Sequence, residues 1–355
     1  MSPFTVLVVI LMVQGVLLCM TLALLVINRA KRQARAREAQ VAGASLVTPL
    51  IRLLVEDAPA AEIVAILRAM PVNTAAEETM NIAVARIQPR ERSELAAALR
   101  EEPWVARVID RSTSRLWWRR LEAARILAFV GDARDREVVS RLLGDRHPAV
   151  QAAASACVPG VGDAQLVREV IDALSHRSPM VQQYELNMLR EMSTVAVPLM
   201  LERLDASLPS EVLLIALRLA ETIDAPECLD RIVALRGHPD ADVRLADTKA
   251  LRKYFSPLSI SALFSLLDDA DWRVRSQAAR GLGELSVDDA IPHLARAMSD
   301  TAWWVRFRAA LALAALGENG RRALREVRVG AADVARDMAA FVSGLSEGSV
   351  LELSE

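Results

Sequence analysis

Apolar positions recur along the chain at a fixed spacing that predicts repeated helices. We take Val274 as the marker position of one copy. Steps of 31 residues from it reach the markers of other copies, Val150, Val181, Val212, Val243 and Val305, and a further step back reaches Arg119 inside a similar block. Positions four, eight and eleven after this marker are apolar in most copies, as in Ala278, Leu282 and Leu285. These offsets fall on one face of a helix with 3.6 residues per turn. Each copy is therefore predicted to begin with an amphipathic helix.

The second part of each copy predicts a second helix. Twelve residues after the marker stand Gly131, Gly162 and Gly317, residues of the type that a helix C-cap favours. Twenty residues after it, a second apolar stripe runs through Val139, Val170, Leu201, Ile232, Leu263 and Leu294. About seven such helix pairs predict an all-α fold, an α-solenoid in which each unit contacts its neighbours.

The repeated residues resemble a known family. The pattern D-x-x-x-x-V-R-x-x-A-A-x-x-L occurs at residues 269–282 and again at 300–313. It is similar to HEAT repeats of the short bacterial type, also called phycobilisome-lyase-like HEAT repeats. The resemblance covers residues 114–330, with the copies at 181 and 212 degenerate. It implies a solenoid that binds partners and, in part of the family, chromophore lyase activity.

The segments on either side of residues 114–330 do not keep the 31-residue phase. Residues 45–113 are apolar at helical spacing and predict irregular N-terminal repeats or a cap. Residues 331–346 predict a C-terminal capping helix, and residues 347–355 a loose acidic tail. The solenoid is therefore expected to begin with irregular repeats or a cap and to end in a capping helix.

The N-terminal segment predicts a membrane anchor. Residues 3–27 carry no charge, and as a helix they would be about 38 Å long, enough to cross a bilayer. Residues 1–28 are thus expected to be a transmembrane anchor, followed by a basic juxtamembrane linker over residues 29–44. This linker holds five cations that can contact lipid headgroups: Arg29, Lys31, Arg32, Arg35 and Arg37. No cation precedes the apolar run, which predicts a single-pass inner-membrane protein with its N-terminus outside and its repeats in the cytoplasm.

Charge and composition argue against several kinds of site. Without the five linker cations, 38 basic residues face 45 acidic ones, a poor match for nucleic acid. The three cysteines and four histidines lack the spacing of a zinc site or a disulfide framework, so no metal or cofactor is expected. No arrangement for nucleophilic or acid–base catalysis is recognised. The Gly281-Leu282-Gly283 motif lies inside a predicted helix, a context that does not suit a phosphate-binding loop.

Tryptophan and arginine near the start of the first helix of several copies form the candidate partner-binding site. Both types are enriched in protein-binding hot spots. The candidate residues are Trp117, Trp118, Arg119, Arg120, Trp272, Arg275, Trp303, Trp304, Arg306 and Arg308. Two structural alternatives stay open. The tryptophans can pack over the preceding turn, and the Asp and Arg at fixed phases can cap the helices and link successive repeats.

These observations predict an adaptor or scaffold rather than an enzyme. The expected partner is a membrane-associated protein, in an envelope or polysaccharide-synthesis complex. The alternative is a lyase-like HEAT-repeat enzyme that acts on a chromophore or small ligand.

Overall fold

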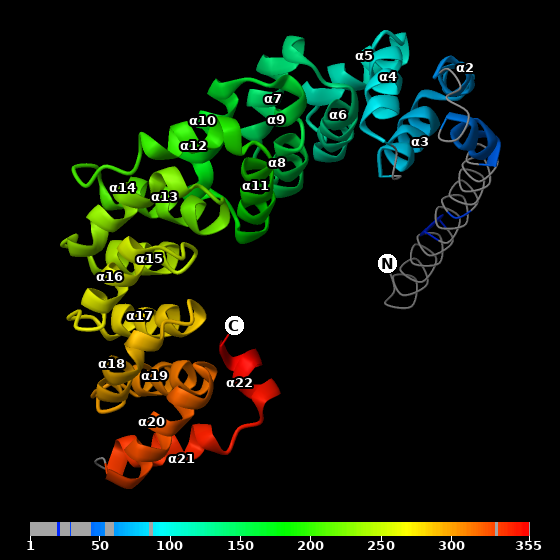
Figure 1. Ribbon diagram of the computed structural model, residues 1–355. Coiled ribbons are helices and arrows are strands. Elements are labelled where there is room, and N and C mark those ends of the chain that lie inside the picture. The colour runs from blue at the N-terminus through cyan, green and yellow to red at the C-terminus, as the bar shows by residue number, and fades with distance from the viewer. Residues whose placement is uncertain are drawn as a thin grey trace, which may run out of the picture. The chain divides into compact units, whose positions relative to one another are not determined.

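The computed structural model describes residues 20–21, 29, 44–53, 60–84, 88–330 and 333–354. These residues form helices and no strand, and they divide into two compact units, Met1–Asp163 and Ala164–Glu355 (Figure 1). The predicted anchor, residues 3–27, lies outside the described residues except for Met20 and Thr21. In the described part of the chain, no helix is long and apolar enough to cross a membrane.

Each predicted repeat forms a pair of helices, here called A and B. The A helices are α6 (Trp117–Val130), α8 (Pro148–Ser155), α11 (Pro179–Glu191), α13 (Ser210–Thr222), α15 (Ala241–Leu251), α17 (Trp272–Glu284) and α19 (Trp303–Ala315). The B helices are α7 (Arg136–Leu143), α10 (Ala164–Ala173), α12 (Ser193–Leu201), α14 (Leu229–Ala234), α16 (Pro257–Leu266), α18 (Ile291–Ala297) and α20 (Gly317–Gly330). Short helical segments complete the connections: α9 (Val158–Val161), η2 (Ala133–Asp135), η3 (Leu174–His176), η4 (Pro226–Cys228), η5 (Leu235–Gly237) and η6 (Asp288–Ala290). The all-α solenoid prediction is confirmed.

Further helices flank the repeats. Residues 44–53 are helical, and α2 (Ala61–Ala69), α3 (Val72–Val84), α4 (Pro89–Arg100), α5 (Pro103–Ile109) and η1 (Asp110–Thr113) follow. At the other end, α21 (Asp333–Ser343) forms within the segment predicted to be a capping helix. The prediction of a loose tail is wrong over α22 (Glu347–Ser354), which is helical and packs against α19.

In the second unit, the helix pairs stack in chain order. The A helices α13, α15, α17 and α19 pack side by side, while α14 packs against α16 and α18 against α20 (Figure 1). Both α21 and α22, in red in Figure 1, pack against α19. The unit is therefore a layer of A helices on a layer of B helices, closed at its C-terminal end by α21 and α22.

The core of each repeat lies on the apolar stripe that the sequence predicts. The fourth position after the marker is fully buried in all seven copies: Ala123, Ala154, Glu185, Ala216, Asp247, Ala278 and Ala309. The marker valines are also buried except Val212, which is half-buried beside a buried Leu213. Glu185 and Asp247 thus place carboxyl groups where the other five copies have a methyl group.

The connection after each A helix follows the predicted cap position only in part. Gly162, Ser286 and Gly317 have φ angles of 67°, 53° and 63°, in the left-handed region that glycine adopts most readily. Gly131 is instead extended, with φ at −67°. The small residues at this phase therefore serve two different backbone geometries.

Candidate functional site

Arginines at one fixed phase link successive repeats through ion pairs. Arg120 pairs with Asp145, Arg244 with Asp269, and Arg275 with Asp300, with Nε–Oδ2 distances of 2.5, 2.7 and 2.7 Å. A second guanidinium nitrogen donates to the other carboxylate oxygen in each pair, at 2.9 Å. These three bidentate pairs form an ion-pair ladder. The interpretation of the arginines at this repeated position as inter-repeat links is confirmed for these three copies.

The ladder aspartates hold the turns that lead into the A helices. The Asp269 carboxylate accepts a hydrogen bond from the Asp271 amide, and Asp145 and Asp300 bind the amides two residues on in the same way. Asp271 is itself the N-cap of α17. The expectation that the fixed aspartate caps the helix is therefore corrected, because it fixes the turn just before the cap.

The electrostatics of the ladder favour its charged form. Burial alone would raise the pKa of Asp269, but the hydrogen bonds from Arg244 and the Asp271 amide outweigh it and the pKa lies below its usual value. Because the folded pKa is depressed, the stabilisation from Asp269 is present at neutral pH and is lost as the pH falls through that value.

We expect Asp269→Ala to destabilise the protein by about 1.5 kcal/mol, since it leaves the largely buried Arg244 guanidinium without its carboxylate. The neighbouring Asp268→Ala is the matched control. Asp268 and its partner Arg296 are 72% and 63% exposed, so its loss should cost less than about 0.5 kcal/mol. Urea denaturation of both variants measures the difference. Equal midpoints for the two variants would show that the ladder does not stabilise the fold.

The ladder leaves two predicted binding residues little freedom to contact a partner. Arg120 and Arg275 have their guanidinium groups fully engaged, each also donating to a carbonyl six residues earlier. Arg306 occupies the same position in the last repeat. The aspartate that would pair with it by the 31-residue spacing is replaced by alanine at position 331. Arg306 keeps the bond to the Asp300 carbonyl, but its Nε is buried without a hydrogen-bond partner among the described residues. Arg119 is exposed.

The predicted tryptophans lie at the surface at the start of their helices. Trp117, Trp118, Trp272, Trp303 and Trp304 are each between 39% and 53% exposed. In the first unit, Trp117 stacks on His147, with ring centroids 4.0 Å apart. Packing over a neighbouring turn therefore accounts for one face of Trp117, and each of the five rings leaves a large apolar surface in water.

In the second unit, two of these tryptophans belong to an aromatic cluster on α19. Trp303 stacks on Phe307 and meets Trp304 edge-on, both at 4.8 Å between ring centroids. Phe307 is buried and also faces Phe341 of α21, at 6.3 Å. The cluster is therefore anchored from beneath, while Trp303 and Trp304 keep exposed faces. Trp272 starts the neighbouring helix α17, which packs alongside α19.

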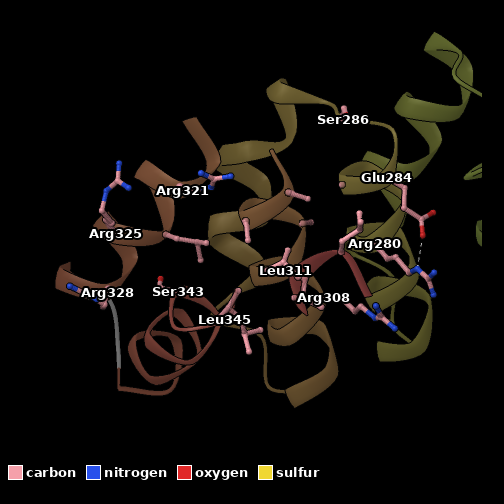
Figure 2. A pocket seen from close by; sticks show the side chains of 18 residues that line it. Arg280, Glu284, Ser286, Arg308, Leu311, Arg321, Arg325, Arg328, Ser343 and Leu345 are labelled. Atoms are coloured by element: carbon pink, nitrogen blue, oxygen red, sulfur yellow. Dashed lines mark hydrogen bonds and ion pairs between the residues drawn. The ribbon is translucent and has the colours of Figure 1, made fainter. Parts of the chain in front are cut away.

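Arg308 lines a pocket that sequence reasoning missed. The pocket has a volume of about 1110 Å³ and is lined by α17, α19, α20, α21 and α22. Figure 2 shows its labelled side chains: Arg280, Glu284 and Arg308 gather toward one end, and Arg321, Arg325 and Arg328 of α20 toward the other. The sequence pattern could not locate this site, because the pocket needs α21 and α22, and these helices lie outside the 31-residue repeats.

The remaining candidate residues carry no recognisable reactive site. Arg29 is exposed, and Lys31, Arg32, Arg35 and Arg37 lie outside the described residues. In the described ranges, no group of three His, Cys, Asp or Glu side chains could hold a metal ion. Burial raises the pKa of the Cys157 thiol well above its usual value and that of Cys228 to about 11. Neither thiol is therefore suited to act as a nucleophile.

Comparison with known proteins finds a similarity in the C-terminal repeats. Residues 260–342 match the family of HEAT repeats. This range runs from α16 to α21 and includes the ladder residues Arg275 and Asp300, the aromatic cluster and most of the pocket wall. No curated protein matches the chain.

Among solved structures, several chains are similar at low identity. An engineered protein is 19% identical over 84% of this chain and 91% of its own, with a TM-score of 0.35. The YibA protein of Escherichia coli is 14% identical over 81% of this chain and 98% of its own, with a TM-score of 0.35. Human deoxyhypusine hydroxylase, solved with glycerol, is 19% identical over 79% and 97%, with a TM-score of 0.30.

Proposed function

We propose that the protein is a membrane-anchored HEAT-repeat adaptor that binds a partner protein through the exposed tryptophans of its A helices. The observation that carries this proposal is the pair Trp303 and Trp304, half-exposed on an aromatic cluster whose base is buried. Large rigid aromatic surfaces of this kind are favoured at the centres of protein interfaces, because their burial releases water at little cost in side-chain entropy.

The regular stacking of the second unit supports an extended contact. Trp272 is the first residue of α17 and Trp303 the first residue of α19, and these two helices pack side by side in the A layer. Trp272, Trp303 and Trp304 therefore lie toward the same edge of the layer. A partner that covers this edge would bury three tryptophans together.

The membrane part of the proposal rests on the uncharged run at residues 3–27 and the cations that follow it. An anchor would confine the repeats to the inner surface of the membrane, where a membrane-associated partner is concentrated. We further propose that this partner belongs to an envelope or polysaccharide-synthesis assembly.

Crosslinking with mass spectrometry in native membranes tests the partner site. In the double variant Trp272→Ala/Trp304→Ala, we expect the number of crosslinks between the repeats and their main partner to fall at least tenfold, because each substitution removes a hot-spot side chain. The matched control is Phe255→Ala, which removes a 78%-exposed aromatic ring in the turn between α15 and α16. Unchanged crosslinks in the double variant would reject the tryptophan edge.

The same cells test the anchor. The full chain should remain in the membrane fraction after an alkaline wash that strips peripheral proteins. Its release into the soluble fraction would contradict the anchor, whatever the crosslinking shows.

A further inference from the structure

The pocket at the C-terminal end of the second unit combines an apolar middle with arginines at its ends. Leu311 of α19, Leu324 of α20, Val342 of α21 and Leu345 line it, and Val350 and Leu351 of α22 complete the wall. In Figure 2, Leu311 and Leu345 lie between the arginines of α17 and α19 and those of α20. A pocket of this size and lining is suited to a small molecule with a sizeable apolar body.

One end of the pocket holds more positive than negative charge. The Glu284 carboxylate is hydrogen-bonded by Arg280 at 2.6 Å and by Arg252 at 3.2 Å. Arg308 of α19 adds a third guanidinium to this group. Burial lowers the pKa of Arg308, and repulsion from Arg280 and Arg252 lowers it further, whereas Glu284 opposes the change. An anion beside Arg308 would relieve this repulsion.

Arg308 meets no carboxylate directly among the described residues. Its one hydrogen bond there is donated to the carbonyl oxygen of Leu353, at 2.5 Å. Leu353 belongs to the last turn of α22, where unpaired carbonyl groups carry the negative end of the helix dipole. The C-terminal end of α22 thus gives Arg308 a partial negative charge but no full anion.

We propose that this pocket binds an anionic amphiphile, with a carboxylate or phosphate beside Arg308 and Arg280 and an apolar chain along Leu311, Leu324 and Leu345. Helix α22 covers the ligand rather than making way for it, because the pocket volume lies between α22 and the repeats. The proposal does not depend on the partner-binding proposal.

Photo-crosslinking of the full chain tests this site. The chain is placed in phosphatidylcholine nanodiscs and exposed to a diazirine-bearing fatty acid or to the fatty alcohol of the same length. The acid should label peptides from α19 to α22 at least tenfold more than the alcohol, because only the acid can pair with the arginines. Equal labelling by the two probes would overturn the proposal.

Two variants test the two halves of the pocket separately. Arg308→Gln removes the cation, and Ala315→Trp fills the pocket from an exposed position without entering the core. Each should lower labelling at least tenfold while circular dichroism shows the parent's thermal unfolding. Arg296→Gln, an exposed arginine of α18 outside the pocket, should label like the parent. Labelling that survives both pocket variants would overturn the proposal.

A further arm identifies the source of the anion. A diazirine-bearing phosphatidylglycerol built into the nanodisc replaces the free acid. Pocket labelling by this lipid supports an anionic headgroup delivered from the bilayer, and labelling by the free acid alone supports a soluble amphiphile. Both results support the shared chemistry, and labelling by neither overturns it.

Discussion

Replacing Gly283 with valine is expected to destabilise the C-terminal repeats by about 3 kcal/mol. Gly283 lies on the face of α17 that packs against α19. A Cβ atom there would lie 2.7 Å from the Cβ and 2.8 Å from the Cα of Ala312. Because one of these contacts is with backbone, the two helices would have to move apart, and the branched valine side chain would widen the gap further.

The companion variant Gly281→Ala provides the control two residues away in the same helix. Its Cβ would meet the Cγ of Arg252 at 2.6 Å and a Leu263 methyl group at 3.2 Å. Both are side-chain atoms, so these contacts can be relieved without moving a helix backbone, and alanine gains about 1 kcal/mol of helix propensity over glycine. We expect the two effects nearly to cancel, leaving stability within about 1 kcal/mol of the parent.

Urea denaturation followed by tryptophan fluorescence measures both variants, since Trp272, Trp303 and Trp304 all lie on α17 and α19. A solenoid can unfold in stages, so the comparison is made on the transition that these tryptophans report. An unchanged midpoint for Gly283→Val would mean that α17 and α19 are not held at this close approach.

The sequence alone could place Gly281 and Gly283 in a helix but could not explain them. The 31-residue phase gives the buried stripe through Val274, Ala278 and Leu282, because hydrophobic periodicity depends only on local spacing. The contact of Gly283 with Ala312 joins two copies of the repeat and depends on how closely their helices pack. Such a distance is set by the tertiary structure, so the glycine pair could also suggest a phosphate loop until its context was considered.

The candidate site, too, could be predicted from the sequence only in part. The phase of Arg120, Arg244 and Arg275 predicted their role between repeats, because a repeated neighbour presents the same aspartate each time. The pocket around Arg308 could not be predicted, since its walls combine α17, α19 and α20 of the repeats with α21 and α22, which fall outside them. The exposure of the tryptophans could not be predicted either, because a side chain at a helix start, such as Trp303 or Trp304, can face either a neighbouring turn or water.

Asp247→Ala is expected to stabilise the protein by about 2 kcal/mol. Asp247 is fully buried, and neither carboxylate oxygen has a hydrogen-bond partner among the described residues. Burying an unpaired polar group costs about 1–3 kcal/mol, and more when the group is charged. The small space left by the carboxyl group costs less than about 1 kcal/mol. Alanine is also the residue that five of the seven copies have at this position.

Glu185 occupies the same position in another copy and is the matched contrast. It is also fully buried, but Arg177 forms an ion pair with its Oε1 at 3.2 Å, and the Arg177 side chain is only 11% exposed. Glu185→Ala would leave that guanidinium without its carboxylate, so we expect a loss of stability where Asp247→Ala gives a gain. A gain in stability of similar size in both variants would show that the ion pair of Glu185 with Arg177, which Asp247 lacks, does not stabilise the fold.

The gain from Asp247→Ala should also depend on pH. Burial raises the pKa of Asp247 well above its usual value, and the attraction of Arg236 only partly opposes this. Between the unfolded pKa, about 3.9, and the higher folded pKa, the folded state binds more protons than the unfolded state, so stability falls as the pH rises. The parent protein should therefore lose stability relative to Asp247→Ala as the pH rises above about 4. The ladder aspartates act in the opposite direction but below this window, because their folded pKa values are depressed. Chemical denaturation at pH 5 and pH 8 tests this, and a gain that is the same at both values would show that the pKa of Asp247 is not raised in the folded protein.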